Sequence, residues 1–230
     1  LIQIGGSFNS LCGTAVIIIT GLLIPSIVDA KISDVFPLMY TALGIFAFAF
    51  IVILMTKIPE NEQNKDTVKQ VEKGKGPMAF RHFVLGAIAI FIYVGVEVGI
   101  PNVLNKWLQN PELNVLGSGV NAEAIAGSVA ATYWFLMLIG RLIGGIVGSK
   151  VSAKSMLTVV SAIGIILTLL AMFGPSTMVK FPAFNGAHGF GMVNIPLNAA
   201  FLVCIGLCTS VMWGGIFNLA VEGLGRYTEK

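Results

Sequence analysis

Glu97 is the one acidic residue that lies deep inside a long apolar stretch of this sequence. A charged side chain at the centre of a membrane costs about 3 kcal/mol on insertion scales, so it must face a polar cavity or a partner. Tyr93 and Pro101 are each four residues away and therefore share its helical face. Proline interrupts helical hydrogen bonding, and interrupted helices near the membrane centre hold substrate in many carriers. The pattern predicts a substrate site at Tyr93, Glu97 and, where the helix unwinds, Asn102; the alternative is a protonated Glu97 bonded to a neighbouring helix.

Small and polar residues recur every four positions near the end of the chain, at Ser210, Gly214 and Asn218, with Trp213 beside them. An indole next to hydrogen-bonding groups suits a sugar, because the C–H faces of a sugar pack on aromatic rings and its hydroxyl groups need partners. Packing between helices explains the same spacing, so both interpretations stay open. Trp134 lies near the middle of another apolar stretch, and we add it to the candidate substrate-binding residues.

Three glycines spaced four apart, Gly140, Gly144 and Gly148, form a stripe within one apolar stretch. Small residues at this spacing let a neighbouring helix approach closely, so we predict a packing seam. The stripe is not a phosphate-binding loop, since it lies inside a span and no strand precedes it. Arg141 lies in the same run. We predict that it closes a gate by pairing with a carboxylate or a helix C-terminus, the alternative being that it extends toward the cytoplasm.

The composition excludes an ordinary soluble protein. Apolar residues make up 56% of the 230 residues, charged residues 11%, and the mean hydropathy is +0.88, whereas soluble domains carry about 25% charged residues. The three cysteines form no metal-binding motif, and the two histidines, His82 and His188, form no HExxH helix. We therefore predict no metal, no cofactor and no enzymatic activity. A membrane-embedded enzyme, the rival class, would need paired carboxylates, a nucleophile with a base, or a metal cluster.

Six stretches are long enough to cross a membrane, which takes about 20 apolar residues in a helix. The charged segment Ile58–Arg81 separates the first two from the other four, and the segment Pro175–Asn194, rich in Gly and Pro, is predicted to be a loop before the last span. Because Leu1 begins in mid-pattern, we expect the sequence to be an internal part of a longer chain. The spans run approximately over Phe8–Val28, Val35–Lys57, His82–Lys106, Ala124–Gly148, Ser155–Gly174 and Ile195–Leu224.

The distribution of Lys and Arg predicts the orientation of the spans. Eleven of the 14 basic residues fall on one side and three on the other, so the first side is predicted to be cytoplasmic. Aromatic residues do not alternate with the basic ones as in a single-strand nucleic-acid platform, so no nucleic-acid binding is expected. The eleven are Lys57, Lys65, Lys69, Lys73, Lys75, Arg81, Arg141, Lys150, Lys154, Arg226 and Lys230, and the three are Lys31, Lys106 and Lys180.

The sequence resembles the major facilitator superfamily, from its fifth to its tenth transmembrane helix. Within that superfamily it is similar to the fucose and glucose/galactose permease branch. The matching runs are SFNSLCGT, FIYVGVEVGIPNVLNKWL, GRLIGGIVGSK and SVMWGGIFNLAVEGLGRYTEK. The resemblance implies six of twelve transmembrane helices: residues 1–57 would be the last two helices of the N-terminal half, 58–81 a cytoplasmic linker, and 82–230 the first four helices of the C-terminal half.

The sequence and the resemblance together predict an all-α membrane protein of the major facilitator type. It would carry a monosaccharide such as fucose, glucose or galactose across a bacterial inner membrane by alternating access. A coupled proton is expected, and sodium is the other candidate ion. The partners would be the sugar, the lipid bilayer and the remaining helices of the full-length protein. The alternatives are the same fold with another cargo, such as an amino acid, a peptide or a drug, or a structural membrane subunit with a closed and dry interior.

Overall fold

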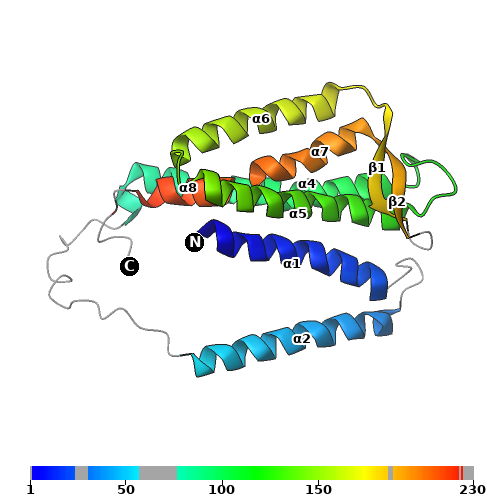
Figure 1. The fold of residues 1–230 in the computed structure, drawn as a ribbon, viewed down its shortest axis with the longest axis horizontal. Helices are drawn as coiled ribbons and strands as arrows, with labels where there is room; N and C mark the ends of the chain where they lie inside the picture. Colours follow the sequence, from blue (N-terminus) through cyan, green and yellow to red (C-terminus); the bar gives the residue numbers. More distant parts are fainter. Residues whose placement is uncertain (1, 24–30, 57–76, 186–188, 223, 225–230) are drawn as a thin grey trace.

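Long apolar helices make up most of the chain in the computed structural model (Figure 1). The structure describes residues 2–23, 31–56, 77–185, 189–222 and 224. Most of the charged segment 58–81 lies outside these residues, so its assignment as a linker stays a prediction. In chain order the elements are α1 (Ile2–Leu23), α2 (Ile32–Met55), the 3-10 turn η1 (Pro77–Ala79), α4 (Arg81–Gln109), α5 (Ala122–Val147), α6 (Ala153–Phe173), β1 (Met178–Phe184), β2 (Phe190–Pro196), α7 (Leu197–Thr209) and α8 (Met212–Val221).

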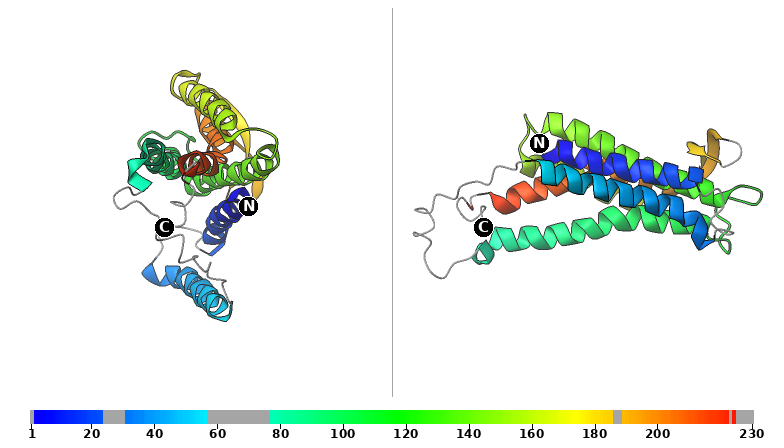
Figure 2. Two further views of the ribbon diagram at one scale, coloured as in Figure 1. Left: turned by 90° about the vertical axis from the view of Figure 1, so that its left-hand side faces the viewer. Right: turned by 90° about the horizontal axis from the view of Figure 1, so that it is seen from below.

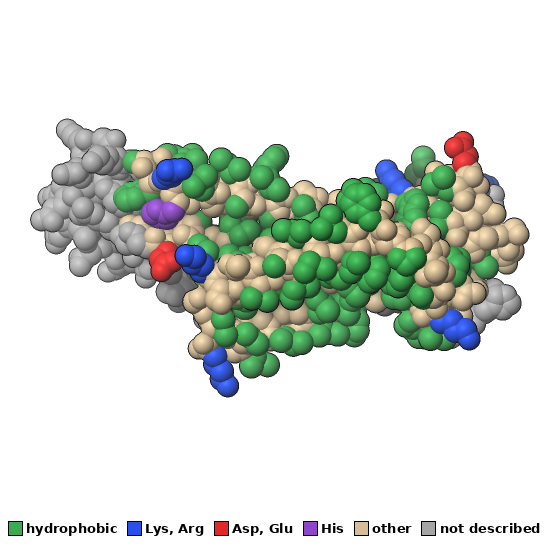
Figure 3. Space-filling model, turned by 90° about the horizontal axis from the view of Figure 1, so that it is seen from above, with side chains coloured by type: hydrophobic (Ala, Val, Ile, Leu, Met, Phe, Trp, Pro, Cys, Tyr) green, Lys and Arg blue, Asp and Glu red, His purple; other side chains and the backbone are tan. Residues whose placement is uncertain are grey.

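The helices confirm the predicted fold class of a helical membrane protein. Among the described residues, five segments are long and apolar enough to cross a membrane: α2, α4, α5, α6, and α7 together with α8. The remaining predicted span corresponds to α1, a helix of 22 residues. Apolar side chains cover the middle of the molecule and charged side chains lie near its two ends on the face drawn in Figure 3, as a membrane-spanning bundle requires.

α5 lies at the centre of the described bundle. It packs against α1, α4 and α7, while α6 packs on α7 and α8, and α4 packs on α8. α2 touches little except α1 and has no buried residue. An end-on view shows α1 between α2 and the other helices (Figure 2). The elements on either side of segment 57–76 are therefore joined mainly through α1 and α5.

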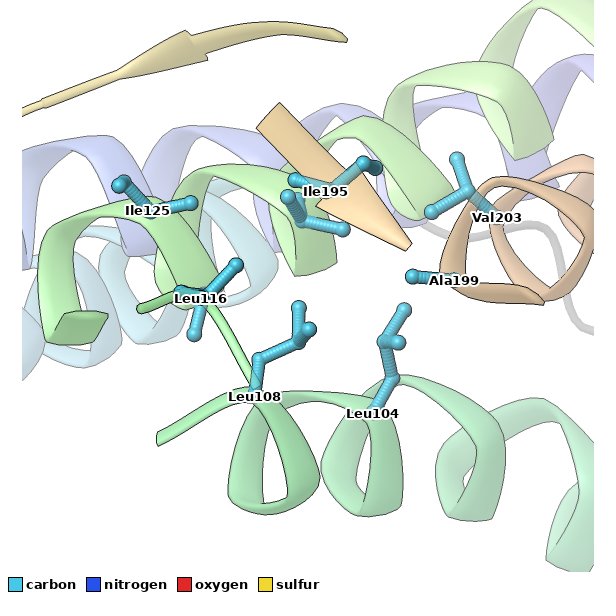
Figure 4. Close-up of a cluster of buried hydrophobic side chains, with 9 residues drawn as sticks. Leu104, Leu108, Leu116, Ile125, Ile195, Ala199 and Val203 are labelled. Atoms are coloured by element: carbon cyan, nitrogen blue, oxygen red, sulfur yellow. The ribbon is translucent and has the colours of Figure 1, made fainter. Parts of the chain in front are cut away.

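One end of the bundle is closed by a cluster of buried apolar side chains. We call it the hairpin end, because β1 and β2 lie there together with the loop 110–121 that joins α4 to α5 (Figure 1). The cluster draws residues from α4, the loop, α5, β2 and α7 (Figure 4). Each Leu, Ile or Val side chain of the cluster contributes about 1.5–3 kcal/mol when it is fully buried. The cluster consists of Leu104, Leu108, Leu116, Ile125, Ala126, Val129, Ile195, Ala199 and Val203.

The segment predicted as a loop between the last two spans contains an antiparallel hairpin. β1 pairs with β2 in a register that runs from Met178 opposite Pro196 to Phe184 opposite Phe190. The backbone N–H of Phe184 donates a hydrogen bond to the Ser128 hydroxyl of α5 at 2.8 Å, which docks the hairpin on the bundle. Alternate side chains of β1 are at least half-buried, and Ala183 is completely buried. The loop prediction was therefore wrong here: the apolar alternation outweighs the glycines and prolines.

The last predicted span is interrupted between α7 and α8, at residues 210 and 211. The Thr209 hydroxyl donates to the carbonyls of Ile205 and Gly206 at 3.3 and 3.2 Å, and the Ser210 hydroxyl donates to that of Leu207 at 2.5 Å. Hydroxyl groups that return to the carbonyls of the preceding turn bend helices. The expected span over Ile195–Leu224 corresponds to α7 and α8 together; it begins after β2 and includes a two-residue turn in which Ser210 and Val211 keep helical backbone angles.

Candidate functional site

Glu97 of α4 and Arg141 of α5 form a buried ion pair. The Arg141 Nη2 atom donates a hydrogen bond to Glu97 Oε1 at 2.8 Å, and the two side chains are only 10% and 6% exposed. Charge-assisted bonds of this kind are roughly twice as strong as neutral ones. Each charge therefore supplies the partner that the other needs in an apolar environment. We predicted that Arg141 either pairs with a carboxylate or a helix C-terminus, or extends toward the cytoplasm. In the structure it pairs with a carboxylate.

The two helices present these residues on buried faces. Tyr93, Glu97 and Pro101 lie four residues apart on α4 and all three are buried, as Tyr133 and Arg141 are on α5. α4 continues through Pro101 without a break, contrary to the predicted interruption. The proline still lacks an N–H group, so the carbonyl of Glu97 receives no hydrogen bond from it. α4 therefore stays helical at Pro101, and the backbone carbonyl of Glu97 lacks its usual hydrogen bond from the residue four positions later.

Arg141 also contacts α1. Its Nη1 atom donates a hydrogen bond to the backbone carbonyl of Gly6. A Cβ atom on Gly6 would lie 3.0 Å from Nη1, which is closer than side chains normally approach. The guanidinium therefore joins three helices, with a carboxylate on one side and a backbone carbonyl on the other.

Two buried hydroxyl groups of α4 and α1 have no hydrogen-bond partner among the described residues. The Tyr93 side chain is 3% exposed, and its hydroxyl lies within electrostatic range of both Glu97 and Arg141 without a hydrogen bond of acceptable geometry. The buried Ser10 hydroxyl of α1 is likewise unpaired. A buried polar group without a partner costs about 1–3 kcal/mol. Such groups are where a polar ligand or an ordered water gains hydrogen bonds.

A second polar contact joins α5 to α7. The hydroxyl groups of Tyr133 and Thr209 are 3.1 Å apart, and both residues are buried. The Tyr133 ring meets the Trp134 ring edge-on, with centroids 5.8 Å apart. Trp134 in turn packs on α1, where a Cβ atom on Gly13 would lie 3.1 Å from the indole Cδ2 atom. In this arrangement α1 covers part of the Trp134 indole.

Trp213 and Phe217 of α8 form a stacked aromatic pair. Their centroids are 5.6 Å apart and their planes differ by 5°. Both remain partly open, at 38% and 36% exposure, and Asn218 beside them is exposed. Gly214 and Gly215 are buried, and a Cβ atom on Gly215 would lie 2.9 Å from Leu157 of α6. The aromatic pair therefore presents a flat apolar surface on the face of α8 that does not pack against α6.

The structure brings some of the predicted site residues together and separates others. Tyr93, Glu97 and Arg141 lie together, whereas Asn102 is exposed and its side-chain amide donates to the carbonyl of Val98 at 2.8 Å. Ser210 lies in a helix contact, bonded to its own helix. Gly6 was missed in the sequence, because a glycine whose carbonyl binds a distant side chain leaves no local signal.

At two of its three positions, the glycine stripe of α5 faces the end of α7 and the turn that joins α7 to α8. A side chain on Gly140 would meet Ser210, and a side chain on Gly144 would meet Val211. Gly148, at the end of the helix, lies near the carbonyl of Gly144 and the end of the Met156 side chain. Within the described residues, no group of three His, Cys, Asp or Glu side chains could hold a metal ion.

Comparisons with known proteins relate the chain to bacterial sugar transporters. It is 29% identical over 231 residues to a protein of Brucella abortus biovar 1 (strain 9-941) named glucose/galactose transporter, and equally to the protein of that name from Brucella abortus (strain 2308). Each alignment covers 97% of this chain and 50% of the relative, so the chain spans about half the length of the curated relatives it matches. No family model matches the chain, and no solved structure matches it. The apolar helices and these relatives identify a multi-pass membrane protein, and the resemblance to glucose/galactose-type transporters is confirmed.

Proposed function

We propose that the full-length protein carries a monosaccharide of the glucose/galactose class across a membrane by alternating access. The observation that carries this proposal is the similarity over 97% of the chain to proteins named glucose/galactose transporter. The major facilitator arrangement, with residues 1–57 in the N-terminal half and 82–230 in the C-terminal half, is part of the proposal. The bacterial inner membrane is the proposed location, with a proton as the coupled ion and sodium as the alternative.

The proposed sugar site centres on Glu97 and Tyr93. Arg141 donates to Glu97 Oε1, and we propose that the other carboxylate oxygen, Oε2, accepts a hydrogen bond from a sugar hydroxyl. The unpaired Tyr93 hydroxyl can both donate and accept. Each sugar hydroxyl likewise donates and accepts, so one sugar can bond to both groups. The site would then satisfy a buried polar group that the protein leaves open.

The aromatic residues supply the apolar part of the proposed site. Trp213 and Phe217 present a stacked, partly exposed surface on which the C–H face of a sugar can pack, with the exposed Asn218 nearby to bond a hydroxyl. Trp134 would contribute only when α1 moves away from its indole. Arg141 acts as the proposed gate because its two hydrogen bonds reach α4 and α1, elements from the two sides of segment 57–76.

Counterflow and uphill uptake in proteoliposomes containing the full-length protein test this proposal. Glucose and galactose should be exchanged and accumulated, and a panel of amino acids, peptides and drugs should not be. Glu97→Ala should weaken sugar binding by about 1.5–3 kcal/mol, the range for hydrogen bonds to charged groups. Glu97→Gln should weaken binding less, while Glu112→Gln in the exposed loop serves as the control.

The same variants separate two roles for Glu97. A substrate-binding Glu97 gives weaker binding in both assays when it is replaced. A Glu97 that carries the coupled proton gives normal counterflow but no accumulation when it is replaced by Gln. Normal counterflow, uptake and affinity in Glu97→Ala would remove Glu97 from the site, and failure of the wild-type protein to move any hexose would remove the proposed function.

A further inference from the structure

α1 and α5 pack together through two contacts in which a glycine of α1 meets a large side chain of α5. Gly6 of α1 meets Arg141 of α5, and Gly13 meets Trp134. The glycines are seven residues apart and so are their partners, which places the two contacts about two turns apart along both helices. In each contact a large α5 side chain occupies the space that a side chain on α1 would otherwise take.

The Gly6 contact differs from the Gly13 contact because it involves the ion pair. Arg141 donates from Nη1 to the Gly6 carbonyl and from Nη2 to Glu97. The guanidinium is a rigid planar group whose donors have fixed directions. Moving Nη1 away from Gly6 must therefore move Nη2 relative to Glu97.

Gly6 leaves little tolerance for a side chain. A Cβ atom there would lie 3.0 Å from Nη1 and 3.4 Å from both Cδ and Cζ of Arg141, so the guanidinium would have to shift. Its neighbour Gly5 is the opposite case, since a Cβ atom on Gly5 would meet nothing within 4 Å. The chain therefore provides a matched pair of adjacent glycines in the same helix.

We propose that Gly6 is a positioning residue: its missing side chain lets Arg141 hold the Glu97 carboxylate and the α1 backbone at the same time. The proposal deepens the proposed function and rests on it for its meaning in transport. A ligand that displaces the guanidinium from Glu97 Oε1 leaves it bonded to the Gly6 carbonyl of α1. The state of Glu97 is thereby transmitted to α1, which lies on the other side of segment 57–76 in the chain.

Labelling of Glu97 by a membrane-permeant carbodiimide tests the proposal without any sugar. The reagent must reach the carboxyl group that it labels, and the Arg141 guanidinium covers the buried Glu97 carboxylate, so labelling of the wild-type protein should be slow. In the full-length protein, Gly6→Ala should raise the labelling rate about fivefold, because it displaces a charge-assisted hydrogen bond, and Gly6→Val should raise it further. Gly5→Ala and Gly5→Val should label at the wild-type rate. Mass spectrometry locates the adduct, and its loss in Glu97→Gln confirms the position.

An Arg141→Lys background provides the second measurement. Lysine has no planar fork that can serve both partners, so Glu97 should label fast in Arg141→Lys and Gly6→Ala should add nothing to that rate. A Gly6→Ala effect of the same size in both backgrounds overturns the proposal, as does equal labelling of the Gly6 and Gly5 variants. A Gly6 effect in a protein that binds no hexose removes the proposed function and leaves the positioning role standing. If the protein binds hexose but the Gly5 and Gly6 variants label equally, the proposed function stands and the positioning role of Gly6 is overturned.

Discussion

Arg141 reaches Glu97 although the two residues lie at different levels of their helices. Counted from the loop that joins α4 to α5, Glu97 is 12 residues from the end of α4 and Arg141 is 19 residues from the start of α5. The difference of seven residues corresponds to about 10 Å along the helix axis. Side chains on helices lean toward their own N-termini, so on two antiparallel neighbours these two side chains lean toward one another. The length and the direction of Arg141 therefore close the gap.

Removing one member of this pair should cost more stability than removing both. Glu97→Gln or Arg141→Gln alone leaves one buried charge without its partner, at a cost of about 3–5 kcal/mol. The double variant Glu97→Gln/Arg141→Gln leaves no such charge and should be more stable than either single variant. Equilibrium unfolding of the full-length protein in mixed micelles measures the three values. Additive losses would show that the two side chains do not depend on one another.

The long helices could be predicted from the sequence because their signal is local. Apolar runs of sufficient length identify α2, α4, α5 and α6 without any knowledge of the packing. The hairpin could not be predicted, because its strands are short and are stabilised by contacts with distant residues such as Ser128. The turn after Thr209 accompanies hydrogen bonds from hydroxyl groups to carbonyls of the preceding helical turn. The pattern of apolar residues in the sequence does not predict such bonds.

The sequence singled out Glu97 and Arg141, and it predicted that Arg141 pairs with a carboxylate or a helix C-terminus, but it did not identify Glu97 as the partner. Glu97 and Arg141 stood out because charges are rare in apolar stretches, yet nothing in the spacing indicated that they meet. Asn102 was selected on the expectation of an unwound helix, and α4 instead stays helical through Pro101. The role of Gly6 follows only from the three-dimensional contact, since its carbonyl is like any other in the sequence.

The glycine stripe gives a prediction with an internal control. Gly144→Ala should destabilise the protein by about 1–3 kcal/mol, the cost of overpacking, because the added methyl group meets Val211. Gly145→Ala changes the adjacent exposed position and should be neutral or stabilising, since alanine favours helix more than glycine does. The thermal unfolding midpoints of both full-length variants test this difference in stability. Equal midpoints would remove the stripe as a packing seam.

The contact between Tyr133 and Thr209 should respond asymmetrically to substitution. Thr209 also bonds to the carbonyls of Ile205 and Gly206, so Tyr133→Phe leaves its hydroxyl satisfied and should cost under about 1 kcal/mol. Thr209→Val removes the partner recorded for the buried Tyr133 hydroxyl and should cost about 1–3 kcal/mol. The double variant should recover part of that loss. Equal costs for the two single variants would contradict this account of the contact.

The predicted orientation is tested by cysteine labelling. Asn64 lies in the charged segment outside the described residues, and the Lys and Arg count predicts that this segment is cytoplasmic. A cysteine at position 64, in a full-length protein without other reactive cysteines, should resist an impermeant maleimide in intact cells and react after the membrane is permeabilised. Labelling in intact cells would reverse the assigned orientation.

The stacked pair on α8 gives the most direct test of the aromatic part of the proposed sugar site. Trp213→Ala removes the larger ring and should raise the hexose dissociation constant about tenfold, a loss of about 1.4 kcal/mol. Trp213→Phe keeps an aromatic surface beside Phe217 and should raise it less, because a smaller ring still packs on C–H groups. Phe91→Ala provides the matched control, since Phe91 is a 79% exposed aromatic residue on α4, outside the proposed site. Equilibrium binding of labelled galactose to the purified full-length variants gives the three constants, with unfolding midpoints recorded in parallel to verify that each variant is folded. An unchanged dissociation constant in folded Trp213→Ala would mean that the stacked pair only packs against other helices, and the sugar site would then be confined to the polar centre at Tyr93 and Glu97.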